Sequence, residues 1–426
     1  MRTLIGLVLC SIALTSDGAT LVSDPESLRR AVRDAQPGDE ILLSAGEWRD
    51  ADLRLHGIGT EAAPIVIRAE QPGRTRLTGT SRLRLSGRFL TVRGLWFCDL
   101  AAPDSDLVEF RADSKTWAEH CRLTDCAITE DSSQISAQKT SRWINLYGTS
   151  NRVDHCRVEG KTNHGATLVV WLSDAWRGQH RIDHNHFGPR PALKGNGGET
   201  LRIGDSSTSL QRADCVIEEN TFLRCNGETE CISNKSCGNL YRSNLFTEVQ
   251  GTLTLRHGND CLVENNFFDG KNVPRTGGIR VIGEGHRILG NVLLGLAGDG
   301  FRSGLVLVNG IPDSPANGYL QPRNILVKGN TWIGCKHPWL LGYNDVKSAT
   351  QAPDHIHFEN NTLISSRDQP AIEVSLQLTH LTWKGNRISA PNPGIPLPPG
   401  LERIDLDATP PAAPRLETGP SWLPAP

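Results

Sequence analysis

Short apolar segments recur along most of the chain, and each contains a polar residue followed by an asparagine. Three related segments without the asparagine come earlier in the chain: VRGLWF around Leu95, LTDCAI at Cys126 and DHCRV at Cys156. Neighbouring units of the whole series lie 22 to 39 residues apart. This spacing indicates one structural repeat that runs through the sequence. The segments that carry the asparagine are IDHNHF, IEENTF, YRSNLF, VENNFF, ILGNVL, VKGNTW, FENNTL and WKGNRI, at Asn185, Asn220, Asn244, Asn266, Asn291, Asn330, Asn361 and Asn386.

The repeat predicts an all-β fold, a single-stranded parallel β-helix or solenoid. Each unit holds short β-branched runs separated by Gly, Asn and Asp, without a sustained helical period. One coil cannot bury its own apolar face, whereas stacked coils can. Leucine-rich repeats would need a leucine-rich consensus, and propeller blades would need longer periods. We expect the repeated asparagines to point inward and to hydrogen bond the turns as a ladder rather than to bind ligands.

The two ends of the chain differ from the repeats. The segment SDPESLRRAVRDAQPGD predicts a short capping helix, with Asp24 as the N-cap, Pro25 at the first helical position and a stop at Pro37. Such a helix would cover the open edge of the first coil. From Pro391 onward the chain carries 11 of its 25 prolines, so we expect an extended tail.

The first residues have the pattern of an export signal. MRTLIGLVLCSIALTSDGA joins a basic residue, a short apolar run and small residues, and the run is too short to span a membrane. We therefore predict a signal peptide at 1–19, a parallel β-helix domain at 20–390, a proline-rich tail at 391–426, and a secreted or periplasmic protein.

Composition narrows the class of partner. With 38% hydrophobic residues and a net charge of −2, the chain can bury a large core but has no global attraction for polyanions. We expect no nucleic-acid or membrane partner, and a monomer. Ten cysteines remain after the signal segment, and they allow either disulfides or buried thiols. No pair of cysteines has zinc-ligand spacing.

One stretch, NGETECISNKS, carries unusual charge. On a strand, Glu228 and Glu230 would point to the same face, about 7 Å apart. Counted from the repeat asparagines, Asn196, these two glutamates, Arg256 and Arg280 fall at similar positions of successive coils. We therefore expect them to form one column on one outer face, with Lys235 beside it. A carboxamide and two carboxylates form a hard-oxygen cluster that suits Ca²⁺.

These motifs resemble those of polysaccharide lyase family 6, the family of alginate lyases and chondroitinase B. The ordered series NGGETLRIG, NGETECISNKS, GTLTLRHGN and GGIRVIGEGHRILGN carries the resemblance, which extends from EILLSAGEWRD to about residue 390. It implies a right-handed β-helix that cleaves acidic polysaccharides by β-elimination. The residue roles that it implies are Ca²⁺ ligation by Asn196, Glu228 and Glu230, Brønsted base for Lys235, Brønsted acid for Arg256, and substrate contact for His257 and Arg280.

The chemistry is consistent with these roles. Removing the C5 proton of a 4-linked uronate requires that the charge of its C6 carboxylate be offset, which a bound Ca²⁺ can do. A lysine base must be neutral, which neighbouring positive charges favour. A guanidinium holds its proton above about pH 12, so whether Arg256 or water protonates the leaving oxygen stays open.

The expected substrate is an acidic polysaccharide, alginate before chondroitin or dermatan sulfate. A uronan C5-epimerase shares proton abstraction at C5, and a glycan-binding β-helix without activity would tolerate loss of Lys235. A hydrolase would need two acids flanking the bond, whereas here two glutamates lie beside a lysine. The preference between mannuronate and guluronate, and between endo and exo cleavage, depends on loops such as GIPDSPANGYLQ.

Overall fold

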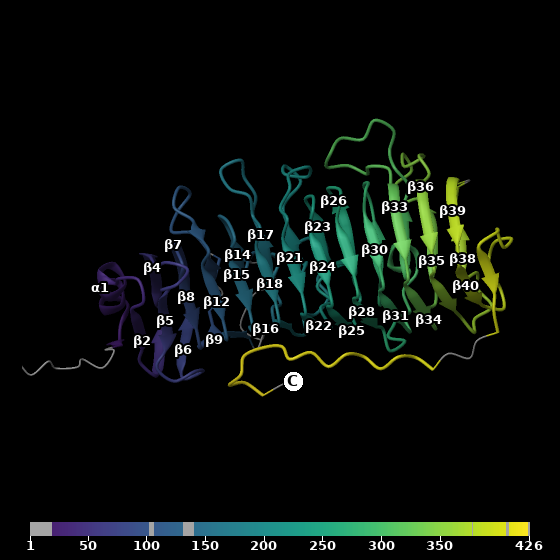
Figure 1. Ribbon diagram of the computed structural model, residues 1–426. Helices are drawn as coiled ribbons and strands as arrows, with labels where there is room; N and C mark the ends of the chain where they lie inside the picture. Colours follow the sequence, from purple (N-terminus) through teal and green to yellow (C-terminus); the bar gives the residue numbers. More distant parts are fainter. Residues whose placement is uncertain (1–18, 102–105, 131–139, 377, 406–408, 425–426) are drawn as a thin grey trace, which may run out of the picture.

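The computed structural model is a right-handed parallel β-helix, as the repeat predicts (Figure 1). The structure describes residues 19–101, 106–130, 140–376, 378–405 and 409–424. The signal peptide predicted at 1–19 lies outside the described residues except for its last one. Within these ranges the strands form three parallel sheets: sheet A with 14 strands, sheet B with 14 strands and sheet C with 13 strands.

Each coil contributes one short strand to each sheet, in the order C, A, B through most of the chain. Sheet A contains β1 (Thr20–Val22), β2 (Glu40–Leu43), β5 (Ile65–Ala69), β8 (Leu90–Arg93), β12 (Arg122–Thr124), β15 (Arg152–Asp154), β18 (Arg181–Asp183), β21 (Val216–Glu218), β24 (Leu240–Arg242), β27 (Leu262–Glu264), β30 (Arg287–Leu289), β33 (Arg323–Lys328), β36 (Asp354–Glu359) and β39 (Thr379–Lys384). Sheet B contains β3 (Gly46–Arg49), β6 (Thr75–Gly79), β9 (Leu95–Leu100), β13 (Ala127–Thr129), β16 (Arg157–Glu159), β19 (His186–Phe187), β22 (Thr221–Leu223), β25 (Leu245–Thr247), β28 (Phe267–Asp269), β31 (Val292–Leu294), β34 (Thr331–Ile333), β37 (Thr362–Ile364), β40 (Asn386–Ser389) and β41 (Leu401–Arg403). Sheet C contains β4 (Asp52–Ile58), β7 (Arg82–Arg88), β10 (Val108–Glu109), β11 (Ala118–Glu119), β14 (Ile144–Leu146), β17 (Leu168–Val170), β20 (Leu201–Ile203), β23 (Glu230–Lys235), β26 (Thr252–His257), β29 (Ile279–Val281), β32 (Leu305–Val308), β35 (Trp339–Tyr343) and β38 (Ile372–Val374).

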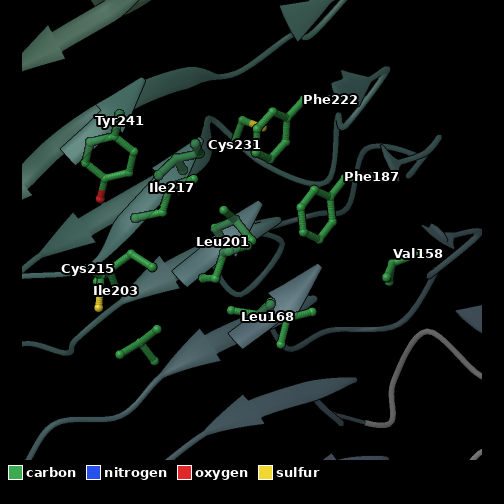
Figure 2. Packing of buried hydrophobic residues seen from close by; sticks show 14 of the residues in the cluster. Val158, Leu168, Phe187, Leu201, Ile203, Cys215, Ile217, Phe222, Cys231 and Tyr241 are labelled. Carbon is green, nitrogen blue, oxygen red and sulfur yellow. The ribbon is translucent and has the colours of Figure 1, made fainter. Parts of the chain in front are cut away.

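The core is one continuous column of apolar side chains inside the three sheets (Figure 2). Phe187, Phe222, Phe246 and Phe268 stack in successive coils, with ring centroids 5.1, 4.7 and 4.4 Å apart. All ten cysteines of the described residues are free and buried, which confirms the thiol alternative. Because every coil shares this core with its neighbours, the repeats stabilise one another.

The turns between sheets A and B hold the predicted asparagine ladder. The Asn244 carboxamide oxygen accepts bonds from the backbone and side-chain nitrogens of Asn220, at 3.1 and 3.0 Å. The Asn244 side-chain nitrogen donates to the oxygen of Asn266 at 2.9 Å and to the Ile217 carbonyl at 2.9 Å. The same pattern of bonds to the next asparagine runs from Asn185 to Asn386, so these residues are structural, as expected.

The helix α1 (Pro25–Asp34) covers the first coil, as the sequence predicts. The Asp24 carboxylate accepts bonds from the backbone nitrogens of Glu26 and Ser27, at 2.9 and 2.8 Å. Leu28 and Val32 are buried against the end of the core. The short 3₁₀ helix η2 (Gly300–Arg302) precedes β32.

The C-terminal segment 409–424 runs back along the outside of the helix toward its N-terminal coils (Figure 1). Its Gly419 nitrogen donates to the His184 carbonyl at 3.0 Å. Farther along, the Trp422 indole nitrogen donates to the Asp125 carbonyl at 2.8 Å, and its ring lies 6.2 Å from that of Trp96. In the described residues, no helix is long and apolar enough to cross a membrane.

Candidate active site

The seven residues predicted for the site line one cavity of about 470 Å³ on the outer side of sheet C. Lys235, Arg256 and Arg280 come from the neighbouring strands β23, β26 and β29. Alternation explains their exposure to the cavity, because Leu253 and Leu255 of β26 point into the core. The other four of the seven predicted residues are Asn196, Glu228, Glu230 and His257.

The expected single column is wrong. Glu230 pairs with Thr252, Lys235 with His257, and Arg280 with Thr254. Register shifts lie between Glu230 and Ile232 and between Asn234 and Lys235. A bulge adds one residue to one strand and redirects the side chains beyond it, so counting residues from the asparagines misplaces them. Glu228 precedes its strand and Asn196 lies in a loop.

Glycines let the two loops that carry the oxygen ligands approach closely. A Cβ atom at Gly198 would lie 2.4 Å from the Gly227 carbonyl oxygen, and one at Gly227 would lie 2.2 Å from that of Gly198. Neither position accepts a side chain without a backbone shift. The Glu228 carboxylate accepts bonds from the nitrogens of Gly197 and Gly198, at 2.8 and 3.0 Å. This close contact aligns NGGE beside NGETE.

Three carboxylates gather at this end of the cavity. Burial, together with the nearby charges of Glu199 and Glu230, raises the pKa of Glu228 to about 7 against the lowering effect of the two glycine amides. The Glu199 side chain is buried and its Oε2 has no hydrogen-bond partner. An unpartnered buried carboxylate oxygen beside a carboxyl with a raised pKa fits a bound cation, because a cation would compensate both. Oxygen ligands of this kind suit Ca²⁺.

A buried arginine holds the Glu199 loop in place. The Arg190 guanidinium donates to the carbonyl oxygens of Glu199, Asn163 and Gly165, at 2.7, 2.9 and 2.8 Å. Burial lowers its pKa to about 10, which leaves it charged at neutral pH. Arg190 therefore ties the ligand loop to the preceding coil. Among the described residues Arg202, on the neighbouring strand β20, makes no ion pair with Glu199, and its guanidinium lies 4.9 Å from the Trp171 ring centroid.

A second group of cavity residues is basic. Among the described residues, Lys235 makes no ion pair, and its amine opens into the cavity. The Arg256 Nη1 donates to the Gly318 carbonyl at 2.8 Å and lies 3.3 Å from the His257 Nδ1. Burial, together with the charges of Arg256 and Lys235, lowers the pKa of His257 to about 3. The imidazole is therefore neutral at neutral pH and can accept a bond from Arg256.

Arg280 lies at the floor of the cavity between two carboxylates. Its guanidinium is 3.4 Å from the Glu230 carboxylate and forms a second ion pair with Asp345. The Tyr319 hydroxyl donates to the same Asp345 carboxylate at 2.7 Å, and burial raises the pKa of Tyr319. The Tyr319 ring lies 4.4 Å from the Arg256 guanidinium. Arg280 and Arg256 are thus fixed by groups that arrive from later coils.

Sequence reasoning missed four of these residues as parts of the site: Arg190, Tyr319, Asp345 and the ligand-like role of Glu199. Tyr319 belongs to the loop GIPDSPANGYLQ, which the sequence marks as a wall of the cleft without singling out one residue. Asp345 is 65 residues from Arg280 in the sequence and follows no repeat position. Only the glycine before Glu199, in a motif parallel to NGETE, could have pointed to this carboxylate.

Comparison with known proteins places this geometry in context. The family model described as chondroitinase B matches residues 22–396. The structure of the alginate lyase AlyGC, of polysaccharide lyase family 6, is 38% identical with a TM-score of 0.88, and the match covers 96% of this chain and 59% of that one. This chain therefore spans 59% of the length of AlyGC. A mannuronic-acid-specific family 6 lyase from the human gut microbiota is 28% identical with a TM-score of 0.84, over 95% and 96% of the two chains. Comparison with curated protein sequences finds no match.

Proposed function

The chain belongs to the chondroitinase B family, polysaccharide lyase family 6, and on that premise we propose that it is an exported, Ca²⁺-dependent lyase that cleaves a 4-linked uronic-acid polysaccharide by β-elimination. The proposed substrate is alginate, since the two similar structures described above are those of an alginate lyase and a mannuronic-acid-specific lyase. The observation that carries the proposal is one cavity lined both by a lysine without an ion pair among the described residues and by three neighbouring carboxylates.

The oxygen-rich end would hold the cation. Asn196, Glu228 and Glu230 are the proposed ligands, and the unpartnered Glu199 oxygen supplies a further one. When bound, Ca²⁺ would offset the charge of the substrate C6 carboxylate and so make the C5 proton more acidic. Without a bound cation, burial favours the protonated form of Glu228, so loading the site releases a proton.

The basic end would perform the proton transfers. Lys235 takes the proton from C5 of the uronate, the electrons of that C–H bond form the C4–C5 double bond, and the bond from C4 to the bridging oxygen breaks. Arg256 donates a hydrogen bond to that leaving oxygen, which acquires its proton from Arg256 or water. The neutral His257 holds the Arg256 guanidinium, whose orientation the Tyr319 ring also limits. Arg280, compensated by Glu230 and Asp345, contacts the substrate at the floor.

The decisive experiment is a substrate panel. The purified protein would be incubated with polymannuronate, polyguluronate, alginate, dermatan sulfate and chondroitin sulfate, and products followed by absorbance of the unsaturated uronate and by mass spectrometry. We expect oligosaccharides with a 4,5-unsaturated end from the alginate polymers. Products with inverted C5 and no unsaturated end would instead identify an epimerase. Binding to the polymers without any product would identify a glycan-binding protein.

A further inference from the structure

A second hollow of about 290 Å³ adjoins the catalytic cavity at its oxygen-rich end. The two share Asn196, Glu228 and Thr229 as a common wall. The far side of this hollow carries Arg275 and Arg302, which do not line the catalytic cavity. Two guanidinium groups therefore lie beside the proposed cation site but outside the region where the bond would be cleaved.

Among the described residues, the Arg302 guanidinium forms a hydrogen bond only through its Nε. Its Nε donates to the Gln250 carbonyl at 2.8 Å, and its guanidinium lies 4.4 Å from the centroid of the Phe301 ring. Burial, together with the charge of Arg275, lowers its pKa to about 10. The nearby acid Asp299 is paired with Lys336 at 2.7 Å. Among the described residues Arg302 makes no ion pair, so its two terminal nitrogens remain available to a ligand.

Arg275 reaches the hollow from a strained loop. Lys271, Asn272 and Arg275 have φ values of 45°, 57° and 69°, in the left-handed region that side chains disfavour. Pro274 forms a bridge with Ala297, which anchors the loop to the next coil. Strained backbone of this kind persists where the surrounding structure fixes it, and it is frequent at ligand sites. In the described part of the chain Arg275 also makes no ion pair.

Arg275 and Arg302 repel each other, and the charge of Asp299, which is paired with Lys336, offsets this repulsion at Arg302 only in part. By contrast, the exposed Arg224 of a neighbouring coil is paired with Glu248 at 2.9 Å. An anion between Arg275 and Arg302 would remove the repulsion and form hydrogen bonds to both guanidinium groups. Phe301, which lies between Arg302 and Arg280, would offer an apolar surface to the sugar ring that carries the anion.

We propose that Arg275 and Arg302 form a separate binding subsite for the carboxylate of a uronate residue next to the pair of residues at the cleaved bond. This inference rests on the proposed function, because it assumes a uronate polymer in the catalytic cavity. It predicts that the protein distinguishes oligosaccharides by length. Affinity and kcat/KM should increase at the length at which one more carboxylate reaches this hollow.

The test compares oligosaccharides of increasing length, from the shortest that is cleaved to the hexasaccharide. The variants are Arg275→Ala, Arg302→Gln and the double variant, with Arg287→Ala as a matched control. Arg287 is an exposed arginine on β30 of sheet A, away from both cavities. For each variant, kcat/KM is measured at each length, and the dissociation constant of the longest oligosaccharide is measured by calorimetry in a Lys235→Ala background.

In the wild-type protein kcat/KM should rise in a step at one length, and the double variant should lose that step. We expect about 10-fold weaker binding of long oligosaccharides for each arginine removed, as for hydrogen bonds to a charged group, with KM affected and kcat retained. The shortest cleaved oligosaccharide should be unaffected, and Arg287→Ala should match the wild type at all lengths.

Two outcomes would overturn the subsite. One is an unchanged length profile in the double variant, and the other is an equal loss at every length. If the wild-type protein gives no unsaturated product from any uronate polymer, the proposed function itself fails, and the calorimetric measurement then shows separately whether the arginines bind uronate.

Discussion

The asparagine ladder and the catalytic cavity are built from the same coils but follow opposite rules. In the ladder, each carboxamide meets the same residue type one coil away, and the strands before and after it pair without shifts from Asn185 to Asn361. In the cavity, the pairing of β23 with β26 shifts register twice, with the extra residue once in β23 and once in β26. The regularly paired coils form the scaffold, and the site is formed where the pairing between coils is irregular.

The two regions also differ in electrostatics. The ladder side chains are uncharged, buried and paired. The cavity contains a buried carboxylate oxygen of Glu199 and the Nε of Arg280 without partners. Unsatisfied buried groups destabilise a fold unless a ligand completes them. Substitutions in the cavity should therefore change activity, whereas substitutions in the ladder should change stability.

The largest expected effect is on turnover. Lys235→Ala and Arg256→Ala should each lower kcat by about 10²–10⁴-fold, because each removes a proton-transfer or leaving-group contact made in the transition state. Both side chains lie at the cavity, so the melting temperature should change little. Steady-state kinetics on alginate checks this, with binding measured by calorimetry. If Lys235→Ala keeps more than about a tenth of the wild-type kcat, well inside that acid–base range, another residue is the base.

Loss of the cation ligands should come next. Glu228→Gln combined with Glu230→Gln should abolish Ca²⁺ binding measured by calorimetry and, with it, activity, while circular dichroism stays unchanged. Glu199→Gln should weaken Ca²⁺ binding by about 10-fold or more, since it removes one charged oxygen ligand. Full activity in excess chelator, with no metal in the purified protein, would rule out the metal assignment.

A ladder substitution should do the reverse. Asn244→Ala removes the acceptor of two bonds from Asn220 and should lower the free energy of unfolding by about 2–3 kcal/mol. The kcat of the folded variant should be close to that of the wild type. Gln71→Ala, which removes an exposed amide, is the control and should shift stability by less than about 0.5 kcal/mol. Denaturant unfolding and kinetics on the same samples measure both quantities. A large loss of kcat with unchanged stability would show that the ladder residue acts on activity rather than on stability.

The histidine of the turn between sheets C and A should give a smaller, pH-dependent effect. His286 accepts a bond from the Cys261 nitrogen at 3.1 Å, and burial lowers its pKa to about 4. Its stabilising contribution is complete above the unfolded value of about 6.5 and declines as the pH falls toward 4, because the unfolded chain binds the proton more tightly.

Between pH 7.5 and pH 5 this histidine should account for about 2 kcal/mol of lost stability. His286→Asn should reduce the pH dependence by that amount, since Asn239 accepts a bond from the Cys215 nitrogen in the same way. Denaturant unfolding at the two pH values measures it. An identical slope in wild type and variant would show that His286 does not contribute.

The smallest effect should come from the C-terminal segment that lies along the regular side. Trp422→Ala removes the contact with Trp96 and the bond to the Asp125 carbonyl. The free energy of unfolding should fall by about 1 kcal/mol, with kcat and KM unchanged. Thermal unfolding and kinetics test this; a change in KM would mean that the segment also acts on the cleft.

Much of the molecule follows from its sequence. The periodic apolar runs, the asparagines, the Asp24 cap and the ordered motifs predict the solenoid, its helix and the family, and all three are confirmed. The chain also identifies the seven residues that come together in one cavity. These features are readable because a stacked coil repeats its neighbour's environment, so local pattern and tertiary contact carry the same information.

The tertiary structure alone decided the arrangement inside the cavity. The register shifts between β23 and β26 replaced the expected column with a staggered set, and Glu199, Tyr319 and Asp345 joined it from loops of other coils. The presence of Arg275 and Arg302 in one second hollow likewise has no counterpart in the repeat. A bulge costs little locally and leaves no mark in residue spacing, while contacts between loops depend on how far each loop folds over the sheet. The sequence therefore specified which side chains the site contains, and packing specified which of them face each other.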